Sequence, residues 1–377
     1  MIKCKPSDYQ KFLKSTYNAN ISLMVYGAPG IGKSDIVRQV AQELAGEQDR
    51  KYREWALMST EEKQYAVAHP AEYFILSDER ISGMDITDLR GLPDFTDNKD
   101  WLITKPYMWI GYYTQPDAAG IIFFDEINLA APVVAGQAYE IILNRTVSDR
   151  KISEKVNIVA AGNRSSDKAG VYELSLPLRD RFCELELEPS ITDWNKWASY
   201  SDVNPKLISF INFRTQFFYN LDKCGEDKGS TPRGIARASK LISGLSDITT
   251  AYAKKLVAIS VGESFATEFC QYLRVYSDLN WDDILYHPNS VLKSNRSIDF
   301  IMAVACEISG QIMNADDKRK KVWLNNLDKV LLALPQEHAV LALVMIAACK
   351  DQKFVQEWIQ SPGGERVMNT ISNDVFS

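Results

Sequence analysis

The fold of this 377-residue chain is decided by the stretch Gly27-Ala28-Pro29-Gly30-Ile31-Gly32-Lys33-Ser34. It fits the phosphate-loop pattern G-x-x-x-x-G-K-[ST] at every position. Residues 21–26 before it are apolar and strand-like, and residues 35–43 after it have a helical pattern. A strand, a glycine loop and a helix start in this order place backbone N–H groups and the positive helix end around a phosphate. The stretch therefore predicts a site for a nucleoside triphosphate.

The residues of this loop have distinct expected roles. Glycines allow backbone turns and a close approach that a side chain would obstruct. Lys33 is expected to reach the β- and γ-phosphates, and Ser34 to offer its hydroxyl to Mg²⁺. The predicted nucleotide-binding residues are Gly27, Ala28, Pro29, Gly30, Ile31, Gly32, Lys33, Ser34 and Asp35.

A second motif narrows the class of nucleotide-binding protein. Residues 120–126, Gly-Ile-Ile-Phe-Phe-Asp-Glu, form a buried-strand pattern that ends in two acids, the Walker B arrangement. Asp125 is expected to hold Mg²⁺ beside Ser34, usually through water. Glu126 is expected to orient and polarise the attacking water. A small-molecule kinase would need no glutamate here, so the pair favours a hydrolase.

Further polar residues lie beside the next two strand patterns, one after the first and two before the second. Asn163 comes just after an apolar strand and could hold the attacking water or the γ-phosphate, although a strand-ending turn is an equal alternative. Arg179 and Arg181 flank Asp180 before residues 183–187. They could form a solvated face, or they could reach a neighbouring subunit's phosphate, where a guanidinium stabilises the transferring group.

A helix start in the second half carries another candidate. Thr231 suits the N-cap, and Pro232 suits the first helical position. Arg233 then lies in the first turn, where the helix dipole disfavours a positive charge. This placement suggests a ligand anion nearby, with an ordinary surface arginine as the alternative.

The distribution of patterns predicts two domains. Apolar content of 46% and charged content of 24% are ordinary for a globular protein. Strand patterns at 21–26, 73–76, 121–124, 156–161 and 183–187 alternate with helices, which predicts an α/β domain over residues 1–190 with a parallel five-stranded sheet flanked by helices. Helix-period residues dominate afterwards, so residues 191–377 are expected to be an all-helical domain with a helical extension and a short loose tail from about residue 363.

Composition excludes several classes. The net charge of −6 argues against a surface built mainly to wrap nucleic acid. There is no run of eighteen apolar residues, and residues 1–6 do not have a signal-peptide pattern. The six cysteines are scattered, without a C-x-x-C pair, and are expected to be reduced thiols. The expected location is the cytoplasm.

Taken in order, these motifs resemble those of an AAA+ ATPase, and within that class the MoxR branch, including versions in bacteriophage genomes. The resemblance rests on Walker A and Walker B, Asn163, the Arg-Phe pair at 181–182 and the Thr-Pro-Arg helix start. It also rests on Asp-Leu-Arg-Gly-Leu-Pro at 88–93 and on Ile-Asn-Leu-Ala-Ala-Pro at 127–132, and it spans residues 22–237, more weakly to about 299.

The resemblance implies further roles. Asn163 would be sensor 1, Arg233 sensor 2, and Arg181 the arginine finger acting in trans, with Arg179 as second choice. The helical domain would be the lid. The chain would form a hexameric ring with ATP and Mg²⁺ at each interface, in a bacterial cytoplasm or in that of the host if phage-encoded. Relatives often carry Arg where Leu129 stands, and Pro where Arg164 stands.

Two segments could face a substrate. Residues 101–113 hold Trp101, Tyr107, Trp109, Tyr112 and Tyr113, which could line a ring pore or stack bases, but packing within the protein is the favoured interpretation. Residues 144–155 resemble a hairpin inserted before sensor 1, and its cations, Arg145, Arg150, Lys151 and Lys155, make it the better candidate for substrate contact.

Three functions remain open. The first is a chaperone-like ATPase that remodels or assembles a protein complex, as the MoxR likeness implies, with a separate von Willebrand A domain protein as partner. The second is a nucleic-acid motor or loader, which the acidity of the chain disfavours. The third is a nucleotide-stabilised scaffold ring with slow turnover, which the catalytic residues Glu126, Asn163 and Arg181 disfavour.

Overall fold

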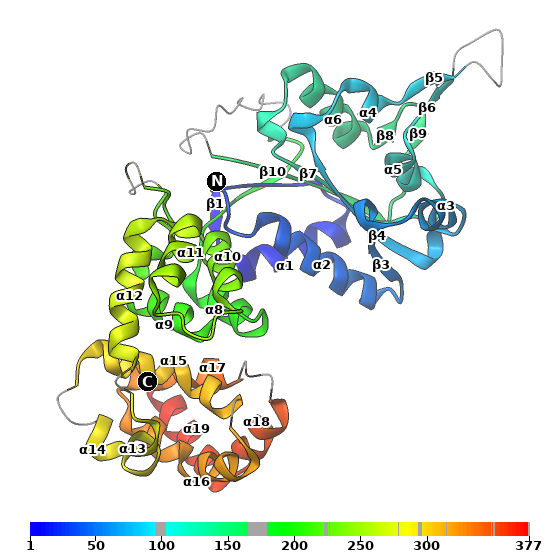
Figure 1. Cartoon of the computed structure of the whole chain (residues 1–377). Helices are drawn as coiled ribbons and strands as arrows, with labels where there is room; N and C mark the ends of the chain where they lie inside the picture. The colour runs from blue at the N-terminus through cyan, green and yellow to red at the C-terminus, as the bar shows by residue number, and fades with distance from the viewer. Residues whose placement is uncertain are drawn as a thin grey trace. The chain divides into compact units, whose positions relative to one another are not determined.

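The computed structural model describes residues 1–94, 103–164, 179–221, 225, 227–277, 279–292, 296–313, 315–347, 349 and 351–375. The chain divides into two compact units, Met1–Pro189 and Ser190–Ser377. In the part that the structure describes, the first unit is α/β and the second is helical (Figure 1).

A parallel seven-stranded sheet forms the middle of the first unit, in the order β1-β11-β2-β10-β7-β4-β3. Its strands are β1 (Ile2–Cys4), β2 (Leu23–Gly27), β3 (Lys51–Glu54), β4 (Tyr73–Arg80), β7 (Ala119–Asp125), β10 (Val156–Gly162) and β11 (Cys183–Leu187). Because the strands are parallel, their carboxyl ends meet at one edge of the sheet. The loops after β2, β7 and β10 therefore lie together, where open α/β sheets bind their ligands.

Helices cover both faces of this sheet. α1 (Pro6–Ala19) packs on α2 (Lys33–Glu47), and α2 contacts β4 and β7. Successive side chains of β7 point to opposite faces, so Ile122 and Phe124 join the hydrophobic core that includes α6 (Pro132–Asn144). Figure 1 shows α1 and α2 on one side of the sheet and α6 on the other. Apolar runs such as β7 and β10 are typical of strands buried on both faces.

The five predicted strands are all present, as β2, β4, β7, β10 and β11, but the predicted count was too low. β1 and β3 add one strand at each edge of the sheet. β1 has only three residues, and β3 reads Lys-Tyr-Arg-Glu. Edge strands carry charge and need no apolar alternation, so no strand pattern marks β3 in the polar stretch of residues 47–72, expected to be helical, which also contains α3 (Thr60–Ala68).

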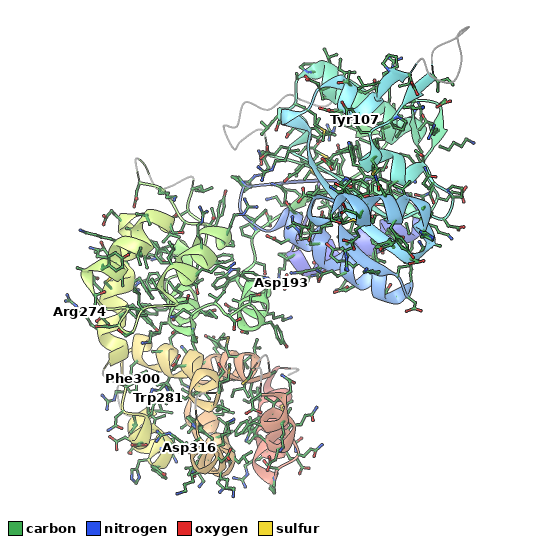
Figure 2. All side chains as sticks on the ribbon, turned by 45° about the vertical axis from the view of Figure 1, so that its right-hand side comes forward. Tyr107, Asp193, Arg274, Trp281, Phe300 and Asp316 are labelled. Atoms are coloured by element: carbon green, nitrogen blue, oxygen red, sulfur yellow. The ribbon has the colours of Figure 1, made fainter. Side chains whose placement is uncertain are left out.

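The insertion between β4 and β7 contains most of the aromatic segment. It comprises α4 (Ile86–Arg90), β5 (Leu92–Asp94), β6 (Ile103–Lys105), α5 (Met108–Gly111) and the 3₁₀ turn η4 (Tyr112–Thr114). Tyr112 and Tyr113 are fully buried, and the Tyr113 hydroxyl donates to Ser77 Oγ at 3.0 Å. Trp109 packs against the same core, whereas Tyr107 is 41% exposed (Figure 2). Packing is therefore the correct interpretation for Tyr112, Tyr113 and the partly buried Trp109, and Trp101 lies outside the described residues.

A hairpin does precede β10. Its strands are β8 (Thr146–Val147) and β9 (Arg150–Lys151), paired antiparallel. Two of its four predicted substrate-facing cations are used within the chain. Arg145 donates to the carbonyl oxygens of Ser153 and Val156, and Lys155 pairs with Asp117 at 2.6 Å. Arg150 and Lys151 are exposed at the hairpin.

In its described residues, the second unit consists of helices around two hydrophobic cores. Its helices are α8 (Ile191–Tyr200), α9 (Pro205–Phe213), α10 (Pro232–Ile242), α11 (Ala251–Val261), α12 (Glu263–Ser277), α13 (Trp281–Tyr286), α14 (Pro288–Leu292), α15 (Ile298–Met313), α16 (Asp317–Ala333), α17 (Gln336–Ala347), α18 (Gln352–Ile359) and α19 (Pro362–Val375). One core surrounds Phe210, Phe265 and Phe269; the other surrounds Trp323 and includes Phe300, near which Trp281 packs (Figure 2).

The loose tail predicted from residue 363 is wrong up to Val375. α19 packs on α16, and its Val367 and Ile371 enter the second core. These two apolar residues stand four apart on one helix face. The Gly363-Gly364 pair at the helix start suggested a loop, and so few apolar residues gave no visible period.

Among the residues that the structure describes, no helix is both long enough and apolar enough to cross a membrane.

Candidate functional site

The loop between β2 and α2 has the backbone that a phosphate loop needs. Gly32, the N-cap of α2, has φ of 96°, in the left-handed region that strains any other residue. At Gly27 a Cβ would lie 2.8 Å from Ile31 Cδ1 and 3.0 Å from Leu187 O. Gly27 is therefore required because a side chain would not fit, and Gly32 is required because of its φ angle.

Lys33 lies at the first residue of α2 and is only 8% exposed. Its Nζ donates to Gly27 O at 2.6 Å, to Ala28 O at 3.2 Å and to Asn163 Oδ1 at 3.4 Å. The ammonium group therefore lies within the loop, beside the amide expected to serve as sensor 1. A buried ammonium requires such partners, and a phosphate is a stronger one than a carbonyl oxygen.

Ser34 and Asp125 lie together at the carboxyl edge of the sheet. Ser34 Oγ donates to Asp125 Oδ2 at 3.2 Å. A hydroxyl and a carboxylate are oxygen ligands of the kind that Mg²⁺ prefers, so this pair fits the predicted metal site. Asp35, the next residue, is instead exposed and pairs with Arg38 at 3.2 Å.

Glu126 follows Asp125 in an uncommon backbone conformation. Its φ and ψ are 56° and 32°, and its N–H donates to Asp125 Oδ1 at 2.9 Å. A non-glycine residue in this region costs free energy, and such residues cluster at functional sites. The Glu126 carboxylate accepts from Ser82 Oγ at 3.3 Å, so Ser82 holds the predicted base in one orientation.

Asn163 lies just after β10 and is anchored by a second asparagine. Asn128 lies in the 3₁₀ turn η5 (Ile127–Leu129) and is 4% exposed. Its Nδ2 donates to Asn163 O at 2.7 Å, and its Oδ1 accepts from Asn163 N at 3.1 Å. The structure thus brings together Lys33, Ser34, Asp125, Glu126 and Asn163.

The two candidate finger arginines differ in their surroundings. Arg179 Nε and Nη2 donate to the Glu184 carboxylate, at distances between 2.8 and 3.2 Å. Arg181 is exposed and has no recorded ion pair with the residues that the structure describes. Residues 165–178, which precede Arg179, lie outside the described part. Arg233 belongs to the second unit, in the first turn of α10; Thr231 caps this helix, with Oγ1 accepting from Gly234 N at 3.0 Å.

Ion pairs near the phosphate loop connect α2 to the sheet strands β3 and β4. Arg38 donates to Glu54 Oε2 at 3.0 Å and to Asp78 Oδ2 at 2.7 Å. Burial raises the pKa of Asp78, and the charge of Arg38 opposes that rise. Burial also raises the pKa of its neighbour Glu79, to about 7.

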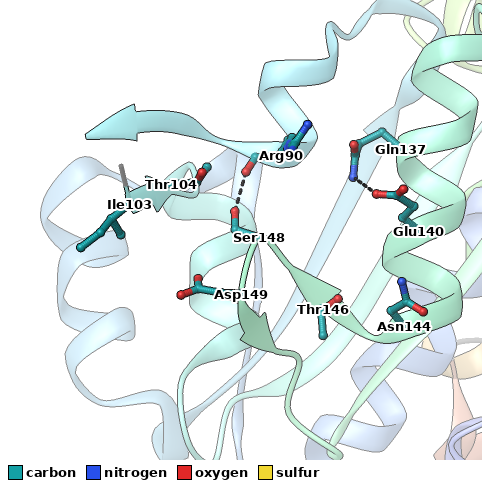
Figure 3. A pocket seen from close by; sticks show the side chains of 9 residues that line it. All are labelled: Arg90, Ile103, Thr104, Gln137, Glu140, Asn144, Thr146, Ser148 and Asp149. Atoms are coloured by element: carbon teal, nitrogen blue, oxygen red, sulfur yellow. Dashed lines mark hydrogen bonds between the residues drawn. The ribbon is translucent and has the colours of Figure 1, made fainter. Parts of the chain in front are cut away.

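A polar cavity of about 600 Å³ lies away from this site, beside the hairpin (Figure 3). None of its lining residues belongs to the phosphate loop. Ser148 Oγ donates to Arg90 O at 2.6 Å on one side, and Gln137 Nε2 donates to Glu140 Oε2 at 3.1 Å on the other. The lining residues are Arg90, Ile103, Thr104, Gln137, Glu140, Asn144, Thr146, Ser148 and Asp149.

Comparison with known proteins shows a similarity over most of the first unit. Residues 23–187 match the model of the ATPase family associated with various cellular activities (AAA). Residues 23–187 are therefore an AAA family domain, and the first unit has the P-loop AAA+ fold. No curated protein matches the chain significantly.

Several solved structures are similar in part. They are Caenorhabditis elegans PCH-2 (13% identity, TM-score 0.33, 71% of this chain and 67% of that one), the Thermotoga maritima RuvB Holliday junction branch migration motor (13%, 0.27, 97% and 93%) and Brucella abortus NtrX in complex with ADP (10%, 0.32, 97% and 68%). With such low TM-scores, the family match and not these structures identifies the domain.

Two residues of the site were not predicted from the sequence. Ser82 follows a strand without any motif around it, so no signal marks it. Asn128 stands in the stretch that resembles MoxR proteins, but the sequence does not show which groups its amide contacts.

Proposed function

We propose that this protein hydrolyses ATP with Mg²⁺ at the carboxyl edge of the sheet. The observation that carries the proposal is the contact of Ser34 with Asp125, 3.2 Å between oxygens, next to Lys33, Glu126 and Asn163. These residues lie near the carboxyl ends of three different strands, β2, β7 and β10. The contact between Ser34 and Asp125 connects the phosphate loop to the Walker B motif. A site that only bound a phosphate would need the first loop alone.

The residues suggest a division of labour. Lys33 exchanges its carbonyl partners for the β- and γ-phosphates of ATP, and the backbone N–H groups of the loop hold the same phosphates. Ser34 and Asp125 would hold Mg²⁺, which would neutralise charge on the phosphates. Glu126 takes a proton from the attacking water, whose oxygen bonds to the γ-phosphorus as the bond to the bridging oxygen breaks. Asn163 orients that water or the γ-phosphate.

Two substitutions separate binding from hydrolysis. Lys33→Ala should abolish tight ATP binding, because it removes the cation that faces the phosphates. Glu126→Gln should bind ATP like the wild type but lose turnover, because the acid acts only on the water. Calorimetry measures the first property and phosphate release the second. Equal loss of ATP binding in both variants would contradict the role given to Glu126.

We further propose that the active form is a hexameric ring in which Arg181 reaches the ATP of the neighbouring subunit. Among the residues that the structure describes, the exposed Arg181 guanidinium has no recorded ion pair and is available to a second chain. Arg179 is instead engaged by Glu184 of its own chain. An arginine finger in trans is worth roughly 10³- to 10⁵-fold in kcat in well-studied phosphoryl transfer. Arg181 is therefore the finger in this proposal, and Arg179 is the matched control.

Mixing experiments test the shared site. Arg181→Ala should bind ATP nearly normally and hydrolyse it poorly, whereas Arg179→Ala should lose much less activity. Mixtures of Arg181→Ala with Glu126→Gln subunits should regain phosphate release at interfaces that pair an intact Glu126 with an intact Arg181. Turnover that does not depend on protein concentration, with no gain on mixing, would show that the site is complete within one chain.

The finer assignment follows the MoxR likeness. We propose that Arg233 serves as sensor 2 in a helical lid domain, and that ATP turnover remodels or assembles a protein complex in the cytoplasm, with a von Willebrand A domain protein as a separate partner. The cavity lined by Thr146, Ser148 and Asp149 supports the adjacent hairpin as the surface that meets the protein client. The Glu126→Gln form, which should hold ATP without turnover, is the form in which to capture that client.

A further inference from the structure

One buried side chain connects the loop after β7 to the end of β10. Asn128 stands two residues after Glu126, in η5, and makes a pair of hydrogen bonds with both main-chain polar groups of Asn163. The donor–acceptor distances are 2.7 and 3.1 Å. Asn128 thus binds Asn163 as a neighbouring strand would, although it uses a side chain.

Strand pairing does not hold Asn163 itself. The β7–β10 ladder ends at the pair Phe124 and Ala160, and the β2–β10 ladder ends at Tyr26 and Gly162. Asn163 therefore lies one residue beyond the regular sheet. Its main chain is instead fixed by the amide of Asn128.

The packing around this amide is tight. A Cβ on Gly162 would lie 2.8 Å from Asn128 Oδ1 and 2.9 Å from its Cγ. The glycine thus lets the Asn128 side chain approach the strand end. A short side chain with one donor and one acceptor is needed in this space, and asparagine provides both. Aspartate has the same shape but would place an oxygen against the Asn163 carbonyl.

The side chain of Asn163 then reaches the phosphate loop, where its Oδ1 accepts from Lys33 Nζ at 3.4 Å. Asn128 therefore fixes the backbone from which this contact extends. We propose that Asn128 is a positioning residue for ATP hydrolysis, which holds the Asn163 amide at a set place relative to Glu126. This inference rests on the proposed ATPase function.

The geometry separates positioning from binding. Asn128 has no recorded hydrogen bond to the phosphate loop, so loss of its amide should leave the groups that bind phosphate and Mg²⁺ in place. What changes is the position of Asn163 relative to the attacking water. A displacement of about 1 Å at a reacting centre can cost roughly 100-fold in rate.

Asn157 supplies a matched control on the same strand. It is fully buried, and its Nδ2 donates to the carbonyl oxygens of Thr16 and Ile21 at 3.2 and 3.0 Å. It stands near the start of β10, whereas Asn163 follows the strand's carboxyl end. Asn128→Asp and Asn128→Leu are therefore compared with Asn157→Asp and Asn157→Leu, with thermal melting to show which variants fold.

Asn128→Asp should lower kcat by about 10- to 100-fold and change the Kd for ATP by less than about threefold. The Asn157 variants should lose stability but keep kcat within about twofold of the wild type. In a double-mutant cycle, the variant that combines Asn128→Asp with Asn163→Ala should be only about as slow as Asn163→Ala alone. Asn128 acts through the Asn163 amide, so its substitution has no further effect once that amide is absent. Rate losses that multiply, or an Asn128→Asp kcat equal to that of the Asn157 control, would overturn the proposal.

Hydrogen exchange gives a readout that needs no turnover. The Asn163 N–H is bonded to Asn128 Oδ1, so Asn128→Leu, or Asn128→Asp where the leucine variant does not fold, should lose protection in a peptide covering residues 158–164. Unchanged protection there would overturn the positioning role. If the wild type released no phosphate while this protection was lost, the proposed ATPase function would fail and the anchoring of Asn163 by Asn128 would stand.

Discussion

At the scale of single residues, the chemical groups of the site are held by neighbours that react with nothing. Ser82 is the simplest case: within the described part of the chain, its recorded contact with the site is the 3.3 Å hydrogen bond to the Glu126 carboxylate. Ser82→Ala should therefore lower kcat by about fivefold, the equivalent of one hydrogen bond of roughly 1 kcal/mol, and leave ATP affinity unchanged. Phosphate release and calorimetry measure the two effects. Ser15→Ala, which removes an exposed serine hydroxyl on α1, is the control; a kcat equal to that control would remove Ser82 from the account.

At the scale of elements, β4 carries a half-buried acid next to β7, the strand that ends at Asp125. Glu79 pairs in register with Phe124 of β7, and burial, with the charges of Asp78 and Asp88, raises its pKa from 4.5 to about 7. Between these two values the unfolded chain releases the proton first, so the first unit should lose stability as pH rises from about 4.5 to 7. Glu79→Gln should remove that loss and stabilise the unit at pH 8 by at most about 3 kcal/mol, with little effect at pH 4. Urea unfolding at both pH values measures this, and an equal change at both would contradict it.

At the scale of the whole molecule, the sequence predicts the features that have a local pattern, such as a motif, an apolar run or a helical period. The Walker motifs, the apolar runs of β7 and β10 and the change to helical periods near Pro189 all follow from local patterns. β3 and α19 do not, because an edge strand carries charged residues and α19 contributes few apolar residues to a core, among them Val367 and Ile371. The contacts that hold the site together, from Ser82 and Asn128, join residues 35 or more positions apart. No local pattern encodes such a contact. The sequence therefore indicates the candidate site residues, but it does not indicate the residues that hold them, Ser82 and Asn128.

The most direct test of the central claim is the rate of phosphate release from ATP with and without Mg²⁺, in the wild type and in Asp125→Asn. The account predicts that a chelator abolishes release in the wild type and that added Mg²⁺ restores it. Asp125→Asn should be slower by at least about 100-fold at any Mg²⁺ concentration, because a metal ion at this place contributes several kcal/mol to the transition state. Release that is insensitive to the chelator, or equal in the two proteins, would contradict the assignment of Ser34 and Asp125 as the metal site of an ATPase.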